Sequence, residues 1–225
     1  MKEEKIISIN PDDRVEKTIQ EAMTIYANKV KYGFYEVDVE ATFQFQLMAI
    51  IQKLLNQYTL DINERFQIIL EKNFPLNGIN DEIDGVIKYH CNGVEKMYLI
   101  EFKYKKMRDG GPNSGNLDSY IDLYELNTLK NNSNIAGCYF IFMTDDKNFT
   151  IQSANQGTRS NFPMYDGYKI TQNVNYCAIC DAAKNRLINN HLPICLSFDT
   201  DIYIEYTSFD SSNNHTYWYY IAKIK

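Results

Sequence analysis

Two strand-like segments on either side of Asn92-Gly93 constrain the fold more than any other feature of the chain. Residues 83–89 and 97–104 are rich in β-branched, aromatic and other apolar side chains, a composition typical of strands. An Asn-Gly pair between two such segments favours the tight turn of a β-hairpin, because both residues tolerate the positive φ angles of that turn. The sequence therefore predicts an antiparallel hairpin near the middle of the chain.

The register of this hairpin brings three polar side chains together. A turn centred between Asn92 and Gly93 places Asp84 directly opposite Glu101, and directly opposite residues share a face of the sheet. Lys103 follows Glu101 by two positions and points to the same face. One interpretation is a solvated strand face with a cross-strand ion pair. The other is a functional site, because the strand around Glu101 is otherwise apolar.

Two carboxylates held close together repel each other unless a proton or a cation lies between them. Asp84 and Glu101 offer the oxygen ligands that Mg²⁺ and Mn²⁺ prefer. A lysine beside such a metal can orient or help to deprotonate a water molecule and offset the charge on a phosphodiester. The sequence therefore predicts metal-assisted phosphoryl transfer, with Asp84, Glu101 and Lys103 as the catalytic residues and Mg²⁺, or Mn²⁺ in its place, as the cofactor.

Helices and further strands are expected around the hairpin. Apolar residues recur at the spacing of amphipathic helices in segments 10–33, 40–56 and 117–129. The segment 137–143 is continuously apolar, which is typical of a strand covered on both faces and, after a crossover helix, paired in parallel. Other strands are expected at residues 66–71, 165–170, 194–198, 202–206 and 217–224. The pattern predicts an α/β fold with a mixed central sheet flanked by helices.

The composition favours one folded domain. Of the 225 residues, 44% are hydrophobic and 23% are charged, which is far from the composition of disordered chains. The sequence has neither the long apolar run of a membrane span nor the apolar stretch of a secretory signal. We therefore expect a cytoplasmic protein with no membrane partner. The net charge of −6 neither indicates nor excludes nucleic-acid binding.

At these residues the chain resembles the PD-(D/E)xK nuclease superfamily, which has the restriction-endonuclease-like fold. The matching elements are the strand with Asp84, the hairpin, and Glu101-Phe102-Lys103. In that superfamily a helix precedes the hairpin, and a helix and a buried strand follow it. The resemblance implies that Asp84 and Glu101 bind the metal, that Lys103 is the catalytic lysine and that the Phe102 carbonyl completes the coordination. It also implies that Glu40, on the preceding helix, reaches the metal site.

The chain is more narrowly similar to a group of poorly characterised bacterial members of the superfamily. Their pattern has an acid and a glutamine that open the first core helix, here residues 40–44, and a later turn, here residues 142–146. The residue before Asp84 is isoleucine and not the proline of the superfamily's name. Glu82 has the same strand parity as Asp84 and is the alternative first acid.

This similarity covers residues 36–224 and suggests how the expected single domain, residues 1–225, is divided. We expect a nuclease core at residues 36–225 and an N-terminal helical extension at residues 1–35. The similarity brings no known substrate with it.

Four basic residues lie within a span of six, directly after the expected active strand. Besides Lys103 they are Lys105, Lys106 and Arg108. They form either a solvated loop or a phosphate clamp beside the metal site, in which case these three residues bind nucleic acid.

The five cysteines, at positions 91, 138, 177, 180 and 195, do not suit a disulfide framework, and we expect free thiols. Cys177, Cys180, His191 and Cys195 could instead form a zinc site. Apolar residues interleaved among them favour buried thiols.

We therefore expect a metal-dependent endonuclease that hydrolyses DNA, with restriction or defence as its setting by analogy with the superfamily. Cutting both strands of a duplex generally needs two sites, which a homodimer would supply. The alternative is a non-catalytic module of the same fold that binds nucleic acid or protein. An RNA-directed toxin would differ only in its substrate.

Overall fold

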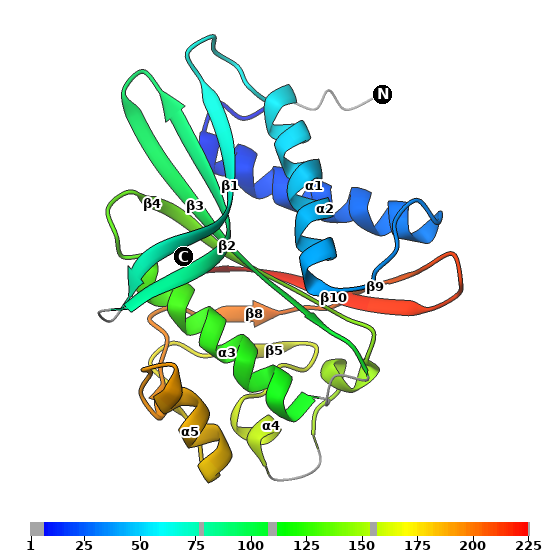
Figure 1. Cartoon of the computed structure of the whole chain (residues 1–225), viewed down its shortest axis with the longest axis vertical. Coiled ribbons are helices and arrows are strands. Elements are labelled where there is room, and N and C mark those ends of the chain that lie inside the picture. The colour runs from blue at the N-terminus through cyan, green and yellow to red at the C-terminus, as the bar shows by residue number, and fades with distance from the viewer. Residues whose placement is uncertain (1–6, 77–78, 108–111, 154–156, 225) are drawn as a thin grey trace.

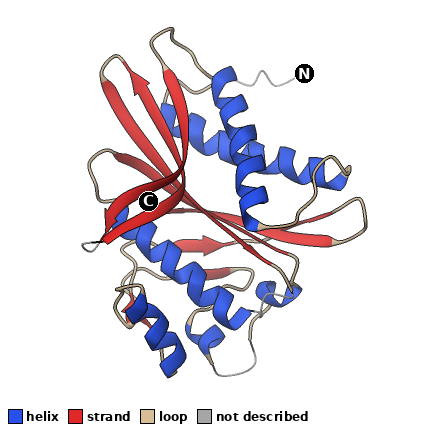
Figure 2. Ribbon diagram, in the orientation of Figure 1, coloured by secondary structure: helices blue, strands red, loops and turns tan. Residues whose placement is uncertain are grey.

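A six-stranded mixed sheet lies at the centre of the molecule in the computed structural model, which describes residues 7–76, 79–107, 112–153 and 157–224 (Figure 1). Across the sheet the strands are β1 (Arg65–Leu76), β2 (Ile79–Cys91), β3 (Val94–Lys105), β4 (Ile135–Thr144), β10 (Thr216–Ile224) and β9 (Thr207–Asp210). Helices flank this sheet (Figure 2). The predicted α/β class with a mixed, helix-flanked central sheet is confirmed.

The three predicted helices are present in the predicted order, and shorter helices follow in the second half of the chain. The helices are α1 (Pro11–Lys31), α2 (Glu40–Gln57), α3 (Pro112–Leu129), the 3₁₀ helix η1 (Lys147–Thr150), α4 (Thr158–Asn161) and α5 (Asp181–Asn189). The helix α5 was not expected from the sequence, because the segment is mostly polar and has few apolar residues from which a helical period can be recognised. Among the described residues, none of the helices has the length and apolar character that crossing a bilayer requires.

The first three strands form an antiparallel meander. Asn92 and Gly93 have φ angles of 49° and 81°, as the predicted hairpin turn requires. Val86 lies opposite Leu99, which is the predicted register. The first strand is longer than predicted, because it lies at the edge of the sheet and continues through Pro75, a residue that edge strands tolerate.

The β1–β2 ribbon is irregular at Glu71. This residue has a φ angle of 53°, and the ladder between the two strands skips its position. Beyond it, Phe74 and Ile83 belong to the same hydrophobic cluster as the buried residues of α3. The outer part of the ribbon therefore contributes to the α3 side of the core.

The helix α3 connects β3 to β4, and the two strands are parallel, as predicted. Glu101 lies beside Phe140, and Lys103 lies beside Phe142. The strand β4 is buried over most of its length, and β10 pairs with its other edge in the antiparallel direction. Both neighbours and both faces of β4 are thus occupied.

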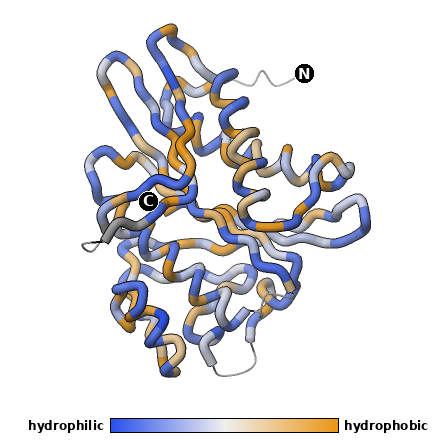
Figure 3. The backbone as a smooth tube through the Cα atoms, in the orientation of Figure 1, coloured by the Kyte–Doolittle hydropathy of each residue, from blue (hydrophilic) through white to orange (hydrophobic). Residues whose placement is uncertain are grey.

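Two hydrophobic layers enclose the sheet. One layer contains α1 and α2, and the other contains α3 (Figure 1). Val15, Ile19 and Met23 of α1 have no exposed surface and belong to the first layer together with Phe102. Figure 3 shows hydrophobic residues gathered where the strands pass between the helices. The helix of the expected N-terminal extension is therefore packed into the core.

Two small two-stranded sheets complete the fold, and one of them carries a disulfide bond that was not expected from the sequence. They are β5 (Tyr168–Ile170) with β8 (Ile202–Ile204), and β6 (Tyr176–Cys177) with β7 (Cys195–Leu196). Cys177 and Cys195 lie opposite each other and are disulfide-bonded, so the expectation of free thiols was wrong for these two. Strands of two residues leave no periodic pattern from which their pairing could be predicted. Cys91, Cys138 and Cys180 are free, and the zinc alternative loses two of its thiolates.

Candidate active site

The strands β2 and β3 separate at the position of the predicted site. The last pair of the ladder between them is Gly85 with Ile100. Beyond it, the Asp84 carboxylate accepts a hydrogen bond of 2.8 Å from the Phe102 N–H. A side chain thus takes the place that the carbonyl of a neighbouring strand would occupy. The strands open into a split, and Asp84 lies within it.

Two residues at the start of α2 hold this split. Glu40, the first residue of the helix, accepts a hydrogen bond of 2.6 Å from the Tyr104 N–H. Gln44, one turn later, donates through Nε2 to the Asp84 carbonyl oxygen at 2.7 Å. The acid and the glutamine that open α2 therefore fix the β3 and β2 sides of the split, and the structure brings Glu40 to the strand that carries Glu101.

Glu101 is a buried acid with a relative exposure of 6%. It points to the α3 face of β3, because Leu99, two residues earlier, packs in the α3 cluster. Burial and the nearby carboxyl groups of Asp84 and Asp122 raise the pKa of Glu101 well above its ordinary value, and Lys103 only partly opposes this rise. A carboxyl pair of this kind is stable when a proton or a cation lies between its members.

Lys103 is held by Asp122 from α3. The Lys103 Nζ lies 2.9 Å from Asp122 Oδ2, and the two side chains are 17% and 15% exposed. Burial alone would lower the pKa of Lys103, but the carboxylates of Asp122 and Glu40 outweigh it and hold this pKa above its ordinary value. Burial raises the pKa of Asp122 to about 6, against the effect of Lys103. Lys103 is therefore a cation at neutral pH, suited to offset negative charge and unsuited to act as a base.

Asp122 is a site residue that the sequence analysis missed. On its own, an aspartate in an amphipathic helix looks like a solvent-facing residue. The signal that could have identified it is a match of two spacings. Asp118 and Asp122 lie one helical turn apart on α3, whereas Lys103 and Lys105 lie two residues apart on the strand that this helix covers. Each aspartate pairs with one of these lysines.

Two of the three residues of the expected phosphate clamp form separate ion pairs. Lys105 Nζ lies 2.9 Å from Asp118 Oδ2, and Lys106 Nζ lies 3.3 Å from Asp38 Oδ1. The first pair links β3 to α3, and the second links the end of β3 to the segment before α2. Arg108 lies outside the described residues. A clamp formed by Lys105 and Lys106 would require both lysines to leave these partners.

The burial of Glu101 predicts a measurable cost in stability. Because its pKa in the folded protein is raised, the stability it contributes is complete below its ordinary pKa and is lost as the pH rises through the folded value. We expect Glu101→Gln to raise the free energy of unfolding at pH 7.5, in EDTA, by about 1–4 kcal/mol, the range found when buried ion pairs are replaced by well-packed uncharged residues. Urea denaturation at pH 7.5 and pH 4 measures this. An equal change in the free energy of unfolding at both pH values would contradict a raised pKa for Glu101, because the gain in stability should vanish at pH 4, where the wild-type carboxyl group is largely protonated in both states.

The two carboxyl groups in the split suit a divalent cation, although the described residues contain no group of three or more histidine, cysteine, aspartate or glutamate side chains placed to hold a metal ion. The Asp84 carboxylate lies beside Glu101, because it accepts from the N–H of the next residue, Phe102, and it contributes to the raised pKa of Glu101. A hard cation such as Mg²⁺ would relieve the repulsion between the two carboxyl groups and accept oxygen ligands from both. No protein-family model, no curated protein and no solved structure matches this chain.

Proposed function

We propose that the protein is a Mg²⁺-dependent nuclease of the PD-(D/E)xK kind, with a restriction-endonuclease-like fold, that hydrolyses phosphodiester bonds in DNA. The observation that carries this proposal is the carboxyl pair of Asp84 and Glu101, which meets at the split between β2 and β3 with Lys103 on the same face. The order of elements supports it, because α2 precedes the antiparallel meander, and α3 and the parallel strand β4 follow it.

Each site residue has a role in this proposal. Asp84 and Glu101 would hold Mg²⁺, with the Phe102 carbonyl oxygen as a further ligand and Glu40 beside them. Bound Mg²⁺ supplies an activated water molecule and neutralises charge on the phosphate. Lys103, protonated and fixed by its ion pair with α3, donates to the phosphate oxygens and stabilises the charge that develops there.

A second candidate function is a module that binds nucleic acid or protein without cleavage. Asp84 and Glu40 each give an oxygen to a backbone N–H of β3, which is a structural role that needs no catalysis. The two functions differ in whether a divalent metal supports cleavage.

A cleavage assay separates these functions. Plasmid, single-stranded DNA and RNA are incubated with the wild type and with Asp84→Asn, in Mg²⁺, in Mn²⁺ and in EDTA. We expect the wild type to cut plasmid DNA in either metal and not in EDTA, and Asp84→Asn to cut about 10²–10³-fold more slowly. Asparagine keeps an oxygen that can accept from the Phe102 N–H, so the variant should retain the fold.

Glu82→Gln is the matched control, because this residue is the alternative first acid. It should cut at close to the wild-type rate. If Glu82→Gln instead loses cleavage and Asp84→Asn retains it, the metal ligand is Glu82 and not Asp84. Absence of metal-dependent cutting on every substrate would refute the nuclease and favour the binding module.

A further inference from the structure

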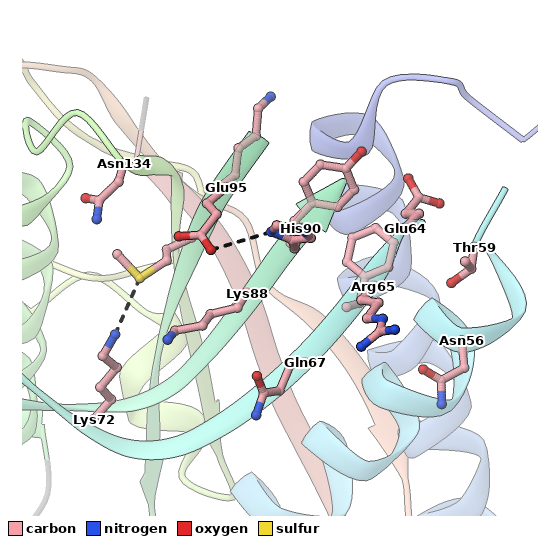
Figure 4. A pocket seen from close by; sticks show the side chains of 14 residues that line it. Asn56, Thr59, Glu64, Arg65, Gln67, Lys72, Lys88, His90, Glu95 and Asn134 are labelled. Carbon is pink, nitrogen blue, oxygen red and sulfur yellow. Dashed lines mark hydrogen bonds and ion pairs between the residues drawn. The ribbon is translucent and has the colours of Figure 1, made fainter. Parts of the chain in front are cut away.

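A groove of about 790 Å³ lies on the meander, apart from the carboxyl groups of the candidate active site. Its walls come from β1, β2 and β3, from the end of α2 and from Asn134, before β4 (Figure 4). Arg65, Gln67, Lys72 and Lys88 are among the residues that line it. None of these residues is among the site residues expected from the sequence or in the proposed nuclease site.

Lys72 and Lys88 extend into the same space from neighbouring strands (Figure 4). The ammonium group of Lys72 contacts neutral groups, with Nζ 3.5 Å from Met97 Sδ and 4.8 Å from the centre of the Phe74 ring. The pKa of Lys72 is lowered, mainly by burial and to a smaller extent by the positive charge of Lys88. Two ammonium groups in this arrangement destabilise each other unless an anion lies between them.

The acids that line the groove have other partners. Glu64 forms a buried ion pair with Arg14 of α1. The Oε1 atom of Glu95 lies 3.5 Å from Nδ1 of His90 on β2. Within the part of the chain that the structure describes, no carboxylate pairs with Arg65, Lys72 or Lys88. The groove is therefore a basic surface on a protein with a net charge of −6.

We propose that this groove binds the phosphate groups of a nucleic-acid strand. Arginine, lysine, asparagine and glutamine are side chains that contact phosphate oxygens in complexes with nucleic acids. Met97, which lines the groove, lies four residues from Glu101 on β3, about 13 Å along a strand. Leu99 between them is buried in the cluster that contains α3, so the groove is a site separate from the carboxyl pair.

The choice of nucleic acid as the source of the phosphates rests on the proposed function, whereas the anionic character of the ligand rests on the lysine pair alone. The test therefore measures binding in EDTA, where cleavage does not occur. A fluorescein-labelled single-stranded DNA is titrated with the wild type and with Lys72→Gln/Lys88→Gln, and anisotropy is recorded between 50 and 300 mM NaCl. We expect the variant to bind at least tenfold more weakly at 50 mM, with a salt slope smaller by about 1.4, which corresponds to two lost phosphate contacts.

Two further variants control for folding and for net charge. Lys72→Arg/Lys88→Arg keeps both charges and should bind within about threefold of the wild type. Lys31→Gln/Lys184→Gln removes two positive charges from α1 and α5 and should leave the salt slope unchanged. A groove variant with wild-type affinity and slope would overturn the proposal, and so would an equal loss in the Lys31→Gln/Lys184→Gln control.

Tripolyphosphate serves as a competitor that carries phosphate groups without a nucleic-acid chain. If it binds the wild type as tightly as the oligonucleotide does, the groove takes a small phosphate ligand and the strand assignment is wrong. If the groove lysines are required for oligonucleotide binding and no substrate is cut in Mg²⁺, the binding role of the groove is supported and the nuclease proposal is refuted. If Lys72→Gln/Lys88→Gln binds normally and cuts in a metal-dependent way, the nuclease proposal is supported and the binding role of the groove is refuted.

Discussion

Replacing Lys103 by methionine should slow metal-dependent cleavage about 10³-fold and leave the affinity for the nucleic acid within a few fold of the wild type. The variant loses the cation that stabilises charge on the phosphate, an effect typically worth 10²–10³-fold or more in rate. Methionine keeps a side chain of similar length. Asp122 would then lack its partner, but burial raises its pKa and Lys103 is the group that opposes this rise, so loss of the lysine favours the protonated form of Asp122. Single-turnover kinetics and anisotropy in EDTA measure the two quantities.

Lys105→Met is a close control for this experiment. Lys105 lies on the same strand and makes an ion pair of the same length, 2.9 Å, with Asp118 on the same helix. We expect this variant to cut at least one-tenth as fast as the wild type. If both variants lose cleavage equally, the cause is the loss of contact between β3 and α3, and the catalytic role of Lys103 is refuted.

Replacing Arg14 by methionine should lower the free energy of unfolding by about 3–5 kcal/mol. Arg14 and Glu64 are 3% and 5% exposed, and the guanidinium donates to both oxygens of the carboxylate. Burial opposes the charge on Glu64, but Arg14 and the Leu60 N–H hold the pKa of Glu64 below its ordinary value. Removal of the arginine leaves an uncompensated buried charge, which costs about this much in other proteins. Urea denaturation at pH 7.5 measures the change.

Two further variants separate the ion pair from general effects of substitution. Arg14→Met/Glu64→Leu removes both charges and should recover most of the stability, because apolar pairs often replace buried ion pairs without loss. Lys96→Met breaks the ion pair with Asp12, whose members are about one-third exposed, and should cost less than about 1 kcal/mol. A loss of under 1 kcal/mol for Arg14→Met would show that α1 is not fixed to the meander through this pair.

The sequence was most informative where a local pattern determines long-range geometry. Asn92-Gly93 fixes the turn, and the turn fixes which residues of β2 and β3 face each other, so the convergence of Asp84 with Glu101 was predictable. The parallel pairing of β4 with β3 followed from one apolar segment after a helix. The opening of the strands beyond Gly85 was not predictable, because it depends on contacts from α2 that are made across about forty residues of chain.

Buried charge was the main feature that the sequence concealed. Arg14 and Asp122 occupy positions that a helical pattern assigns to solvent, and only their partners, 50 and 19 residues away, make burial tolerable. The groove with Lys72 and Lys88 was hidden because its lining comes from three strands, the end of α2 and Asn134, and no local pattern in the sequence indicates how these parts meet. The cross-strand disulfide depends on the pairing of two very short strands, for which the sequence carries no signal.

The split between β2 and β3 affects how evolutionary change in this protein should be interpreted. Asp84 and Glu40 accept hydrogen bonds from the amides of β3, so a descendant that has abandoned catalysis still has a reason to keep them. The ammonium group of Lys103 instead forms an ion pair with a side chain, the carboxylate of Asp122 on α3. In a set of diverging homologues, the retained acids would therefore be weak evidence for activity. A lysine that persists where its aspartate has been lost would be stronger evidence, because the ion pair with α3 then no longer gives the fold a reason to preserve it.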